Sequence, residues 1–319
     1  MRLHGAPSRS AALAAVLVCA LLAGACGTIS RTNESVEQYD RAQWSSTQVD
    51  LPLGVRVVAV GDIACAAGEP VTASACQHEA TAELAKSLDP QLVLTLGDTQ
   101  YPKSSLTDLM ASYDKSWGQL LERTRPTVGN HEYQTSGAKG YYTYFKDRQP
   151  GPPGYYRFNT GGWKIYVLNS NCTKVSCAEQ AAWMERGMKA YPMKCTIVTM
   201  HHPRYSSGSG HGNNTAVKPF WAVAYKHRND IVLSGHDHDY ESFLRMDGTG
   251  RYSSVGMQSF VVGTGGKDLY HLGTRQKGSR YFQRSQHGVL ALDLQPGSFG
   301  WKFYALDGTV LDEGTRSCV

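Results

Sequence analysis

The sequence lacks several features that would assign it to a familiar class of protein. Its N-terminal apolar stretch, Ala11–Ala23, is too short for a permanent membrane helix, which needs about 20 residues. No stripe of lysine and arginine accompanies the formal net charge of +5, so nothing indicates a nucleic-acid-binding surface. No two cysteines have the spacing of a thiolate zinc site, and no internal repeat is evident. These absences favour a globular domain, for which 319 residues and 41% hydrophobic content allow a sizeable core.

Residues 1–25 look like an export signal. Arg2 and Arg9 precede the apolar stretch, and a run of small residues suited to cleavage follows it, directly before Cys26. The segment also resembles a bacterial lipoprotein signal, although Ala23 stands where that pattern has leucine. We therefore expect an exported protein, either secreted or anchored to the cell envelope through a lipidated Cys26.

The rest of the chain divides into a tether and one domain. Residues 27–50 are polar and have no apolar periodicity, which predicts a flexible tether. The polar motifs described below run from position 62 to position 238 and must converge, so residues 51–319 are predicted to form a single domain.

Eight cysteines fit an exported protein. Cys19 lies in the leader and Cys26 at the cleavage point, and in an oxidising compartment the other six are expected to form disulfides. The alternative is that some are buried free thiols. The favoured pairs are Cys65 with Cys76, Cys172 with Cys177, and Cys195 with Cys318.

The domain is predicted to begin with a βαβ unit. Val55–Val60 and Gln91–Leu96 are apolar runs typical of buried strands, and the helical stretch Gln77–Leu88 lies between them. Parallel strands joined by a right-handed crossover have their carboxyl ends at the same edge of the sheet. Asp62 and Asp98, which follow the two strands, should therefore lie side by side.

The alternation of helices and strands continues to about residue 234. Further helices are expected at 106–121, 178–190 and 217–227, and further strands at 163–168, 195–200 and 231–234. After Gln258 the pattern changes to hairpin-like strands at 259–262, 289–294 and 301–306. These strands are predicted to form a second sheet packed on the first, which gives an α/β (α+β) fold.

Five polar motifs follow one another along the chain, most of them directly after an apolar run. They contain two carboxylates, a phenol, an amide and three imidazoles, about the number of ligands that two metal ions need. The motifs are Gly61-Asp62, Gly97-Asp98-Thr99-Gln100-Tyr101, Gly129-Asn130-His131-Glu132, Val198-Thr199-Met200-His201-His202 and Gly235-His236-Asp237-His238. The candidate ligands are Asp62, Asp98, Tyr101, Asn130, His201, His236 and His238.

Each candidate also has an alternative interpretation. Asp62 after glycine is compatible with a simple turn, and Tyr101 beside a proline with a packed loop aromatic. His201 at a strand end is compatible with a buried core residue. The occurrence of five such motifs in one chain, most of them at predicted strand ends, favours the metal site.

The motif set resembles the calcineurin-like metallophosphoesterase family, and within it the purple acid phosphatase branch. In the broader family a histidine usually stands two residues after the first aspartate, where this chain has Ala64. In the purple branch a tyrosine takes that histidine's place, and in this chain the corresponding residue is Tyr101. The resemblance covers about Val55–Tyr240, with Gly263–Gly266 as an additional loop near the site, and implies a four-layer αββα sandwich of two mixed sheets flanked by helices.

The resemblance also implies roles for individual residues. His131 would contact the phosphate, and His211 or its rival His202 would protonate the leaving group. Arg204 and Tyr205 follow the fourth motif in the same loop, and for that reason they too are expected to contact the substrate, together with Asn130 and His131. Iron(III) would be held by Asp62, Asp98, Tyr101 and His238, and divalent zinc, iron or manganese by Asp98, Asn130, His201 and His236.

The predicted function is hydrolysis of small-molecule phosphate monoesters by attack of metal-bound hydroxide on phosphorus. One alternative is a phosphodiesterase acting on nucleotide or phospholipid substrates. Another is a metal-dependent, non-catalytic phosphate-binding protein of the cell envelope.

Overall fold

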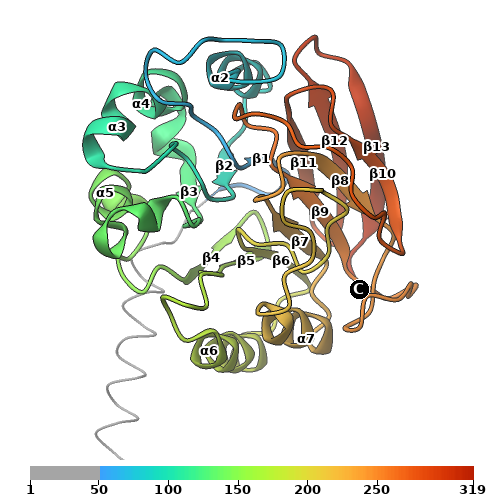
Figure 1. The fold of residues 1–319 in the computed structure, drawn as a ribbon. Helices are drawn as coiled ribbons and strands as arrows, with labels where there is room; N and C mark the ends of the chain where they lie inside the picture. The colour runs from blue at the N-terminus through green and yellow to red at the C-terminus, as the bar shows by residue number, and fades with distance from the viewer. Residues whose placement is uncertain (1–50) are drawn as a thin grey trace, which may run out of the picture. The chain divides into compact units, whose positions relative to one another are not determined.

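The predicted βαβ unit is present at the start of the computed structural model, which describes residues 51–319 (Figure 1). Strand β1 (Val55–Val60) pairs in parallel with β2 (Leu92–Thr95), and helix α2 (His78–Ser87) connects them. A short strand that the sequence did not reveal, β3 (Thr124–Pro126), continues the parallel pairing beyond β2. The carboxyl ends of β1 and β2 therefore lie side by side, as predicted.

Antiparallel strands from the C-terminal part of the chain complete this first sheet. Its order is β13-β12-β11-β1-β2-β3, and β11 pairs antiparallel with β1. The added strands are β11 (Gly288–Gln295), β12 (Ser298–Ala305) and β13 (Val310–Ser317).

The second sheet has the order β10-β8-β9-β7-β6-β5-β4. Strands β5, β6, β7 and β9 run parallel, whereas β4, β8 and β10 are antiparallel to their neighbours. Its strands are β4 (Tyr156–Thr160), β5 (Trp163–Val167), β6 (Cys195–Thr199), β7 (Ile231–Ser234), β8 (Tyr240–Phe243), β9 (Gln258–Val262) and β10 (Ser279–Gln283). The prediction that the strands after Gln258 form a sheet of their own is wrong, because they are divided between both sheets.

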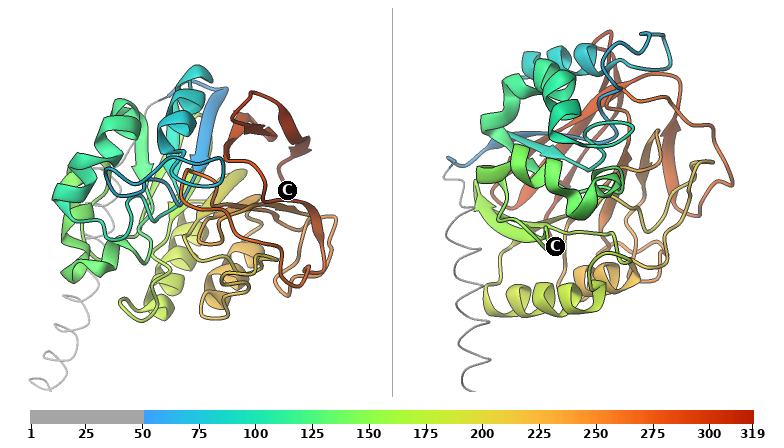
Figure 2. Two further views of the ribbon diagram at one scale, coloured as in Figure 1. Left: turned by 45° about the horizontal axis from the view of Figure 1, so that its top comes forward. Right: turned by 60° about the vertical axis from the view of Figure 1, so that its left-hand side comes forward.

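Alternating side chains of the second sheet enter two different cores. Ile165, Ile197 and Ile231 belong to the cluster shared with the first sheet. Their sequence neighbours point to the opposite face, where Tyr166 and Val198 pack with residues of α6 (Cys177–Ala190) and α7 (Lys218–Lys226). Figures 1 and 2 show these two helices together beneath the second sheet. Two mixed sheets flanked by helices confirm the predicted fold class.

The predicted helix at 106–121 is broken. Ser112 leaves the helical conformation with φ of −133°, and its hydroxyl donates to the carbonyl of Cys65 at 2.7 Å. A tertiary contact thus overrides the local helical pattern. The segment forms α3 (Leu106–Ala111), α4 (Tyr113–Ser116) and η1 (Trp117–Arg123), and the shorter elements after it are η2 (Glu132–Gln134), η3 (Ser136–Ala138), α5 (Lys139–Tyr144) and η4 (Lys146–Arg148).

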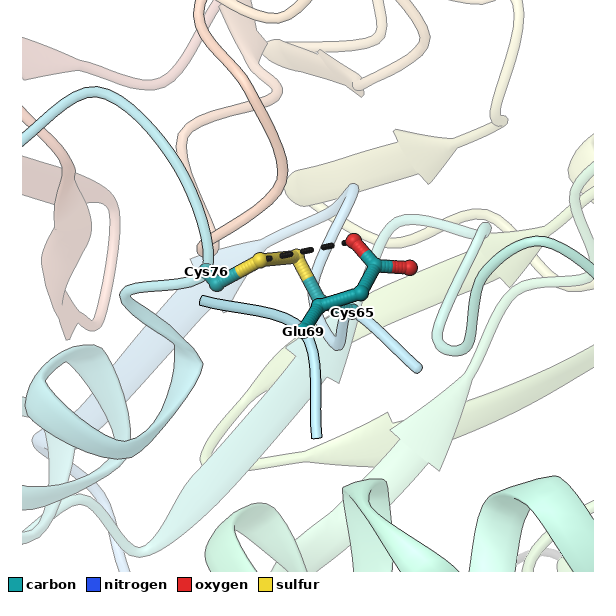
Figure 3. A group of neighbouring side chains, drawn as sticks. All are labelled: Cys65, Glu69 and Cys76. Atoms are coloured by element: carbon teal, nitrogen blue, oxygen red, sulfur yellow. Dashed lines mark hydrogen bonds between the residues drawn. A yellow bond between two sulfur atoms is a disulfide. The ribbon is translucent and has the colours of Figure 1, made fainter. Parts of the chain in front are cut away.

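All three favoured disulfides are present: Cys65–Cys76, Cys172–Cys177 and Cys195–Cys318. The first has a carboxylate beside it, with Glu69 Oε2 3.6 Å from the sulfur of Cys76 (Figure 3). This group is not a metal site, because both sulfurs are already used in the covalent bond.

The predicted leader 1–25, the acylation site Cys26 and the tether 27–50 lie outside the described residues. Within 51–319, no helix combines the length and the apolar character that a membrane crossing requires.

Candidate metal centre

Three of the predicted ligands occupy sharp backbone corners. Asp62 follows β1, Asp98 follows β2 and His236 follows β7, each directly after a glycine. Their φ angles are 60°, 49° and 75°, in the left-handed region that residues other than glycine rarely adopt. Such conformations persist where the surrounding structure over-determines them, which is typical of functional sites. The candidate site therefore combines ligands that follow strands of both sheets.

Neighbouring glycines leave room for these ligands. A Cβ atom on Gly235 would lie 2.5 Å from Asp62 Oδ2, and one on Gly129 would lie 2.2 Å from Asp98 Oδ1. The φ of Gly129 is not positive, so its backbone conformation does not by itself require glycine. The glycine is required because the Asp98 carboxylate occupies the space of a side chain.

Four of the predicted ligands meet at the phenol of Tyr101. Its Oη lies 2.9 Å from Asp62 Oδ1 and 3.2 Å from Asp98 Oδ2. The same oxygen lies 3.0 Å from Nε2 of His238. The side chains of Asp62, Asp98, Tyr101 and His238 are buried.

A second group of four meets at His201. Its Nε2 lies 3.0 Å from Asn130 Oδ1, 3.1 Å from His236 Nδ1 and 3.2 Å from Asp98 Oδ2. Ligand atoms of Asp98, His201 and His236 all lie within 4.8 Å of one another. Asp98 Oδ2 belongs to both groups, so the structure brings all seven predicted ligands into one cluster with a shared carboxylate.

Backbone carbonyls orient two of the histidines. His201 Nδ1 lies 2.8 Å from the carbonyl oxygen of Leu96, and His238 Nδ1 lies 2.6 Å from that of Asp268. A carbonyl oxygen only accepts, so each Nδ1 carries a proton and donates it. This leaves Nε2 directed at the cluster, the arrangement in which proteins present histidine to a metal ion.

The chemistry of the cluster fits bound cations. The hydroxyl of Tyr101 has one proton, yet two carboxylate oxygens and an imidazole nitrogen surround it at hydrogen-bonding distance. His201 Nε2 likewise faces two oxygens, from Asn130 and Asp98, and a ring nitrogen of His236. An excess of lone pairs over protons in a buried site is what a metal ion satisfies.

Burial and neighbouring charges shift the pKa values of several side chains in the cluster. Burial alone would raise the pKa of Asp98, but the adjacent His201 outweighs burial and lowers it far below its ordinary range. Burial would lower the pKa of His201, but Asp98 outweighs it and raises it to about 10. Burial together with the neighbouring histidines lowers the pKa of His236, which keeps that imidazole neutral and able to bind metal.

The three candidate catalytic histidines adjoin the cluster. His131 donates its backbone N–H to Asp98 Oδ1 at 2.8 Å, and its ring lies 4.3 Å from that of Tyr101. The ring of His211 stacks on His236 with centroids 3.8 Å apart. His202 lies 4.3 Å from His236 on the same measure, and its Nδ1 contacts the hydroxyl of Ser170 at 2.8 Å.

Arg204 and Tyr205 are not brought to the cluster by any contact found among the described residues. Tyr205 packs edge-on against Trp221 of α7, with ring centroids 5.2 Å apart. The guanidinium of Arg204 lies 4.4 Å above the ring of Tyr205. Their expected contact with the substrate stays a prediction.

Local sequence patterns indicate no role for Glu132, although it belongs to the third motif. Its buried carboxylate accepts backbone N–H groups from Asp98, Thr99 and Gly129. Hydroxyls of Thr99 and Ser104 also donate to it. The available signal was an acidic residue directly after Asn130 and His131.

The loop after β9 supports the other side of the cluster, as the glycine run at 263–266 suggested. The backbone N–H of Lys267 donates to the carbonyl of Asp62 at 3.1 Å. Tyr270, which the sequence did not single out, stacks on His238 with ring centroids 4.0 Å apart.

Two mixed sheets flanked by helices, with oxygen and nitrogen donors clustered where their edges meet, define the class of the metallophosphoesterases. A model of the calcineurin-like phosphoesterase family matches residues 55–240, and the chain belongs to this family. The match confirms the span of the predicted resemblance. The family is one of phosphoric ester hydrolases that act on phosphate esters, and it implies a dinuclear metal centre.

Relatives in sequence include several purple acid phosphatases, which confirms the predicted branch. Purple acid phosphatase 15 of Arabidopsis thaliana is 25% identical over 278 residues, which cover 76% of this chain and 50% of the relative. Purple acid phosphatase 1 of Ipomoea batatas is 30% identical over 181 residues, 49% of this chain and 37% of the relative. The chain thus spans half or less of the length of these curated relatives.

Solved structures share the fold at low sequence identity. A purple acid phosphatase from yellow lupin seeds has a TM-score of 0.64 at 17% identity, covering 83% of this chain and 54% of the other. GAP50 of Plasmodium has a TM-score of 0.62 at 14% identity, covering 84% and 90%. A dimetal phosphatase from Danio rerio has a TM-score of 0.56 at 13% identity, covering 83% and 99%.

Proposed function

We propose that the chain is an exported dinuclear-metal hydrolase that cleaves small phosphate monoesters, and that residues 51–319 are its catalytic domain. The observation that carries the proposal is the sharing of Asp98 Oδ2 between the group around Tyr101 and the group around His201. A carboxylate in this position can bridge two cations. Two bridged cations are the arrangement that clamps both the attacking and the leaving oxygen of a phosphoryl group.

The two groups of ligands suit different ions. The group around Tyr101 offers three oxygens and one nitrogen, a hard set that favours iron(III). The group around His201 offers an amide oxygen, a carboxylate and two imidazoles, which suits divalent zinc, iron or manganese. We assign iron(III) to Asp62, Asp98, Tyr101 and His238, and the divalent ion to Asp98, Asn130, His201 and His236.

The bound ions would supply an activated water and neutralise charge on the phosphoryl oxygens. The chain's own residues orient the ester. Nδ1 of His131 lies 2.6 Å from the carbonyl of Pro102, so this imidazole donates there and directs Nε2 toward the cluster side, where it lies 3.9 Å from Asp98 Oδ2. From that position His131 would contact a phosphoryl oxygen, and His211 or His202 would protonate the departing alkoxide.

The phosphoryl group of a monoester carries one organic substituent, whereas that of a diester carries two. A phosphodiesterase is the nearest alternative function. Turnover of p-nitrophenyl phosphate compared with bis(p-nitrophenyl) phosphate separates the two. We expect kcat/KM to be higher for the monoester, and a preference for the diester would overturn this part of the proposal.

A non-catalytic role has one specific observation in its favour. GAP50, which shares the fold, is described as the anchor in the inner membrane complex of Plasmodium, so the fold by itself does not imply turnover. The complete ligand set and the adjoining histidines favour catalysis in this chain. The full chain reconstituted with iron and zinc should hydrolyse p-nitrophenyl phosphate, and the Asp98→Asn variant should lose turnover by more than about a hundredfold. Metal-loaded protein that binds phosphate without turnover would support the anchor-like alternative.

Export is proposed from the basic and apolar leader at 1–25 and is supported by the disulfides of the described domain, which are rare in reducing compartments. Metabolic labelling with a fatty acid, compared between the native chain and Cys26→Ser, distinguishes an envelope-anchored protein from a secreted one. Incorporation that depends on Cys26 supports the anchor, and unlabelled protein in the medium supports secretion.

A further inference from the structure

A cavity of about 310 Å³ opens beside the candidate metal centre. Asn130 and His202, both assigned to the centre, form part of its wall. The cavity is therefore continuous with the position that a phosphoryl group would occupy against Asn130. A space of this kind next to a reacting group is where the remainder of a substrate binds.

The other wall residues are mixed in polarity. The polar ones are Gln134, Asn171, Asn214, Ser170 and Thr173, and the less polar part of the wall comes from Tyr133, Cys172 and Ala216. One cationic side chain, Lys174, joins them, and no aspartate or glutamate is among the lining residues. The charge of this wall favours a substituent that is itself negatively charged.

The loop that carries Lys174 is fixed relative to the centre. The backbone N–H of Lys174 donates to the carbonyl of Asn171 at 2.8 Å, and the side-chain amide of Asn171 donates to the carbonyl of Gly129 at 3.2 Å. Asn171 is 6% exposed, and the Cys172–Cys177 disulfide closes the loop around Lys174. The cavity is thus tied directly to the loop of Asn130 and is formed before a ligand arrives, which limits the entropy lost on binding.

We propose that this cavity receives the alcohol part of the phosphate ester and that Lys174 selects alcohols that carry a second anionic group, such as another phosphate. This proposal rests on the proposed function, since the first phosphate must bind at the metal centre. The ammonium group of Lys174 is solvent-exposed, so its contribution is modest and decreases as ionic strength rises.

A matched pair of non-hydrolysable probes tests the proposal by binding alone. Butylphosphonate carries one anionic group, whereas butane bisphosphonate carries one at each end, and neither contains a cleavable ester. Isothermal titration calorimetry on the full chain reconstituted with iron and zinc should show tighter binding of the bisphosphonate, by roughly fivefold. In Lys174→Ala this preference should vanish while the affinity for butylphosphonate stays the same.

The control variant is Lys189→Ala, which removes another exposed lysine from the last turn of α6. It should keep the wild-type preference. Equal binding of both probes by the wild type, or an undiminished preference in Lys174→Ala, would overturn the proposal. Turnover of p-nitrophenyl phosphate by the same samples is read separately: a bisphosphonate preference without turnover refutes the proposed hydrolysis and leaves the subsite standing, and turnover without the preference does the reverse.

Discussion

The carboxylate of Glu132 accepts the backbone N–H of Asp98 at 3.0 Å and so ties the loop of the third motif to that of the second. The same carboxylate accepts the N–H of Gly129 at 2.6 Å and that of Thr99 at 2.8 Å. None of these hydrogen bonds joins Glu132 to the side chain of a predicted ligand. Glu132 positions the carboxylate of Asp98, which both groups of candidate ligands share, by fixing the backbone on which that side chain stands.

Replacing Glu132 with alanine should destabilise the domain strongly. Several buried N–H and hydroxyl groups would lose their acceptor at once, so we expect the free energy of unfolding to fall by about 3–5 kcal/mol. Glu132→Gln keeps the shape and one acceptor oxygen and should lose about 1–2 kcal/mol. Urea denaturation of the three proteins checks the order. A Glu132→Ala variant as stable as the wild type would contradict this role.

Gly235→Ala should weaken metal binding without unfolding the domain. The new Cβ would lie 2.5 Å from Asp62 Oδ2, so the carboxylate of Asp62 would have to move. Asp62 is one of the ligands proposed for iron(III). Gly300→Ala is the control, because its Cβ would find no heavy atom nearer than 3.7 Å. Metal affinity measured by competition with a chelator should fall at least tenfold in Gly235→Ala, about the cost of misplacing one ligand, and stay unchanged in the control.

Asp237 should hold the loop of His211 in place. Its carboxylate accepts the backbone N–H of His211 at 2.8 Å and that of Gly212 at 2.9 Å. If His211 protonates the leaving group, Asp237→Ala should slow hydrolysis of an alkyl phosphate such as glycerol phosphate more than that of p-nitrophenyl phosphate, whose leaving group needs no proton. Equal losses of kcat with both substrates, at unchanged metal content, would argue against this positioning.

Stability should depend on pH through Asp230, which precedes β7 and so lies at the other end of that strand from His236. Burial raises the pKa of Asp230 from 3.8 to about 6, although N–H groups of Thr196 and Val319 partly oppose the shift. A raised pKa means that the folded state holds the proton more tightly than the unfolded state. The stabilisation is complete below pH 3.8 and is lost as the pH rises to about 6, a change of roughly 2–3 kcal/mol.

Asp230→Asn cannot ionise, so the difference in unfolding free energy between the variant and the wild type should change across this range and be constant above it. Denaturant unfolding at several pH values measures the difference. A difference that does not vary between pH 4 and pH 6 would show that the pKa of Asp230 is near its ordinary value.

Much of the fold and the site followed from local patterns. Asp62 and Asp98 could be placed together because each follows a strand of one parallel unit, and that geometry fixes where strand ends meet. The disulfides could be paired because two of them close short loops. The other candidate ligands came from the set of motifs, and their division between two ions came from the family resemblance.

Other features depend on tertiary contacts that no local pattern contains. The helix at 106–121 breaks because Ser112 bonds to Cys65, a residue distant in the sequence. Strand β11 joins β1, and alternation of apolar residues does not specify a pairing partner. Glu132 and Lys174 gained their roles only when loops remote in sequence were placed beside each other.

The most direct test of the central claim is the metal content of the purified full chain after reconstitution with iron and zinc. Elemental analysis should find two ions per chain in the wild type, with a visible absorption band from tyrosinate on iron(III), and far fewer ions in Asp98→Asn. A wild type without bound ions, or an Asp98→Asn variant that retains both, would contradict the claim that the two groups sharing Asp98 form a dinuclear centre.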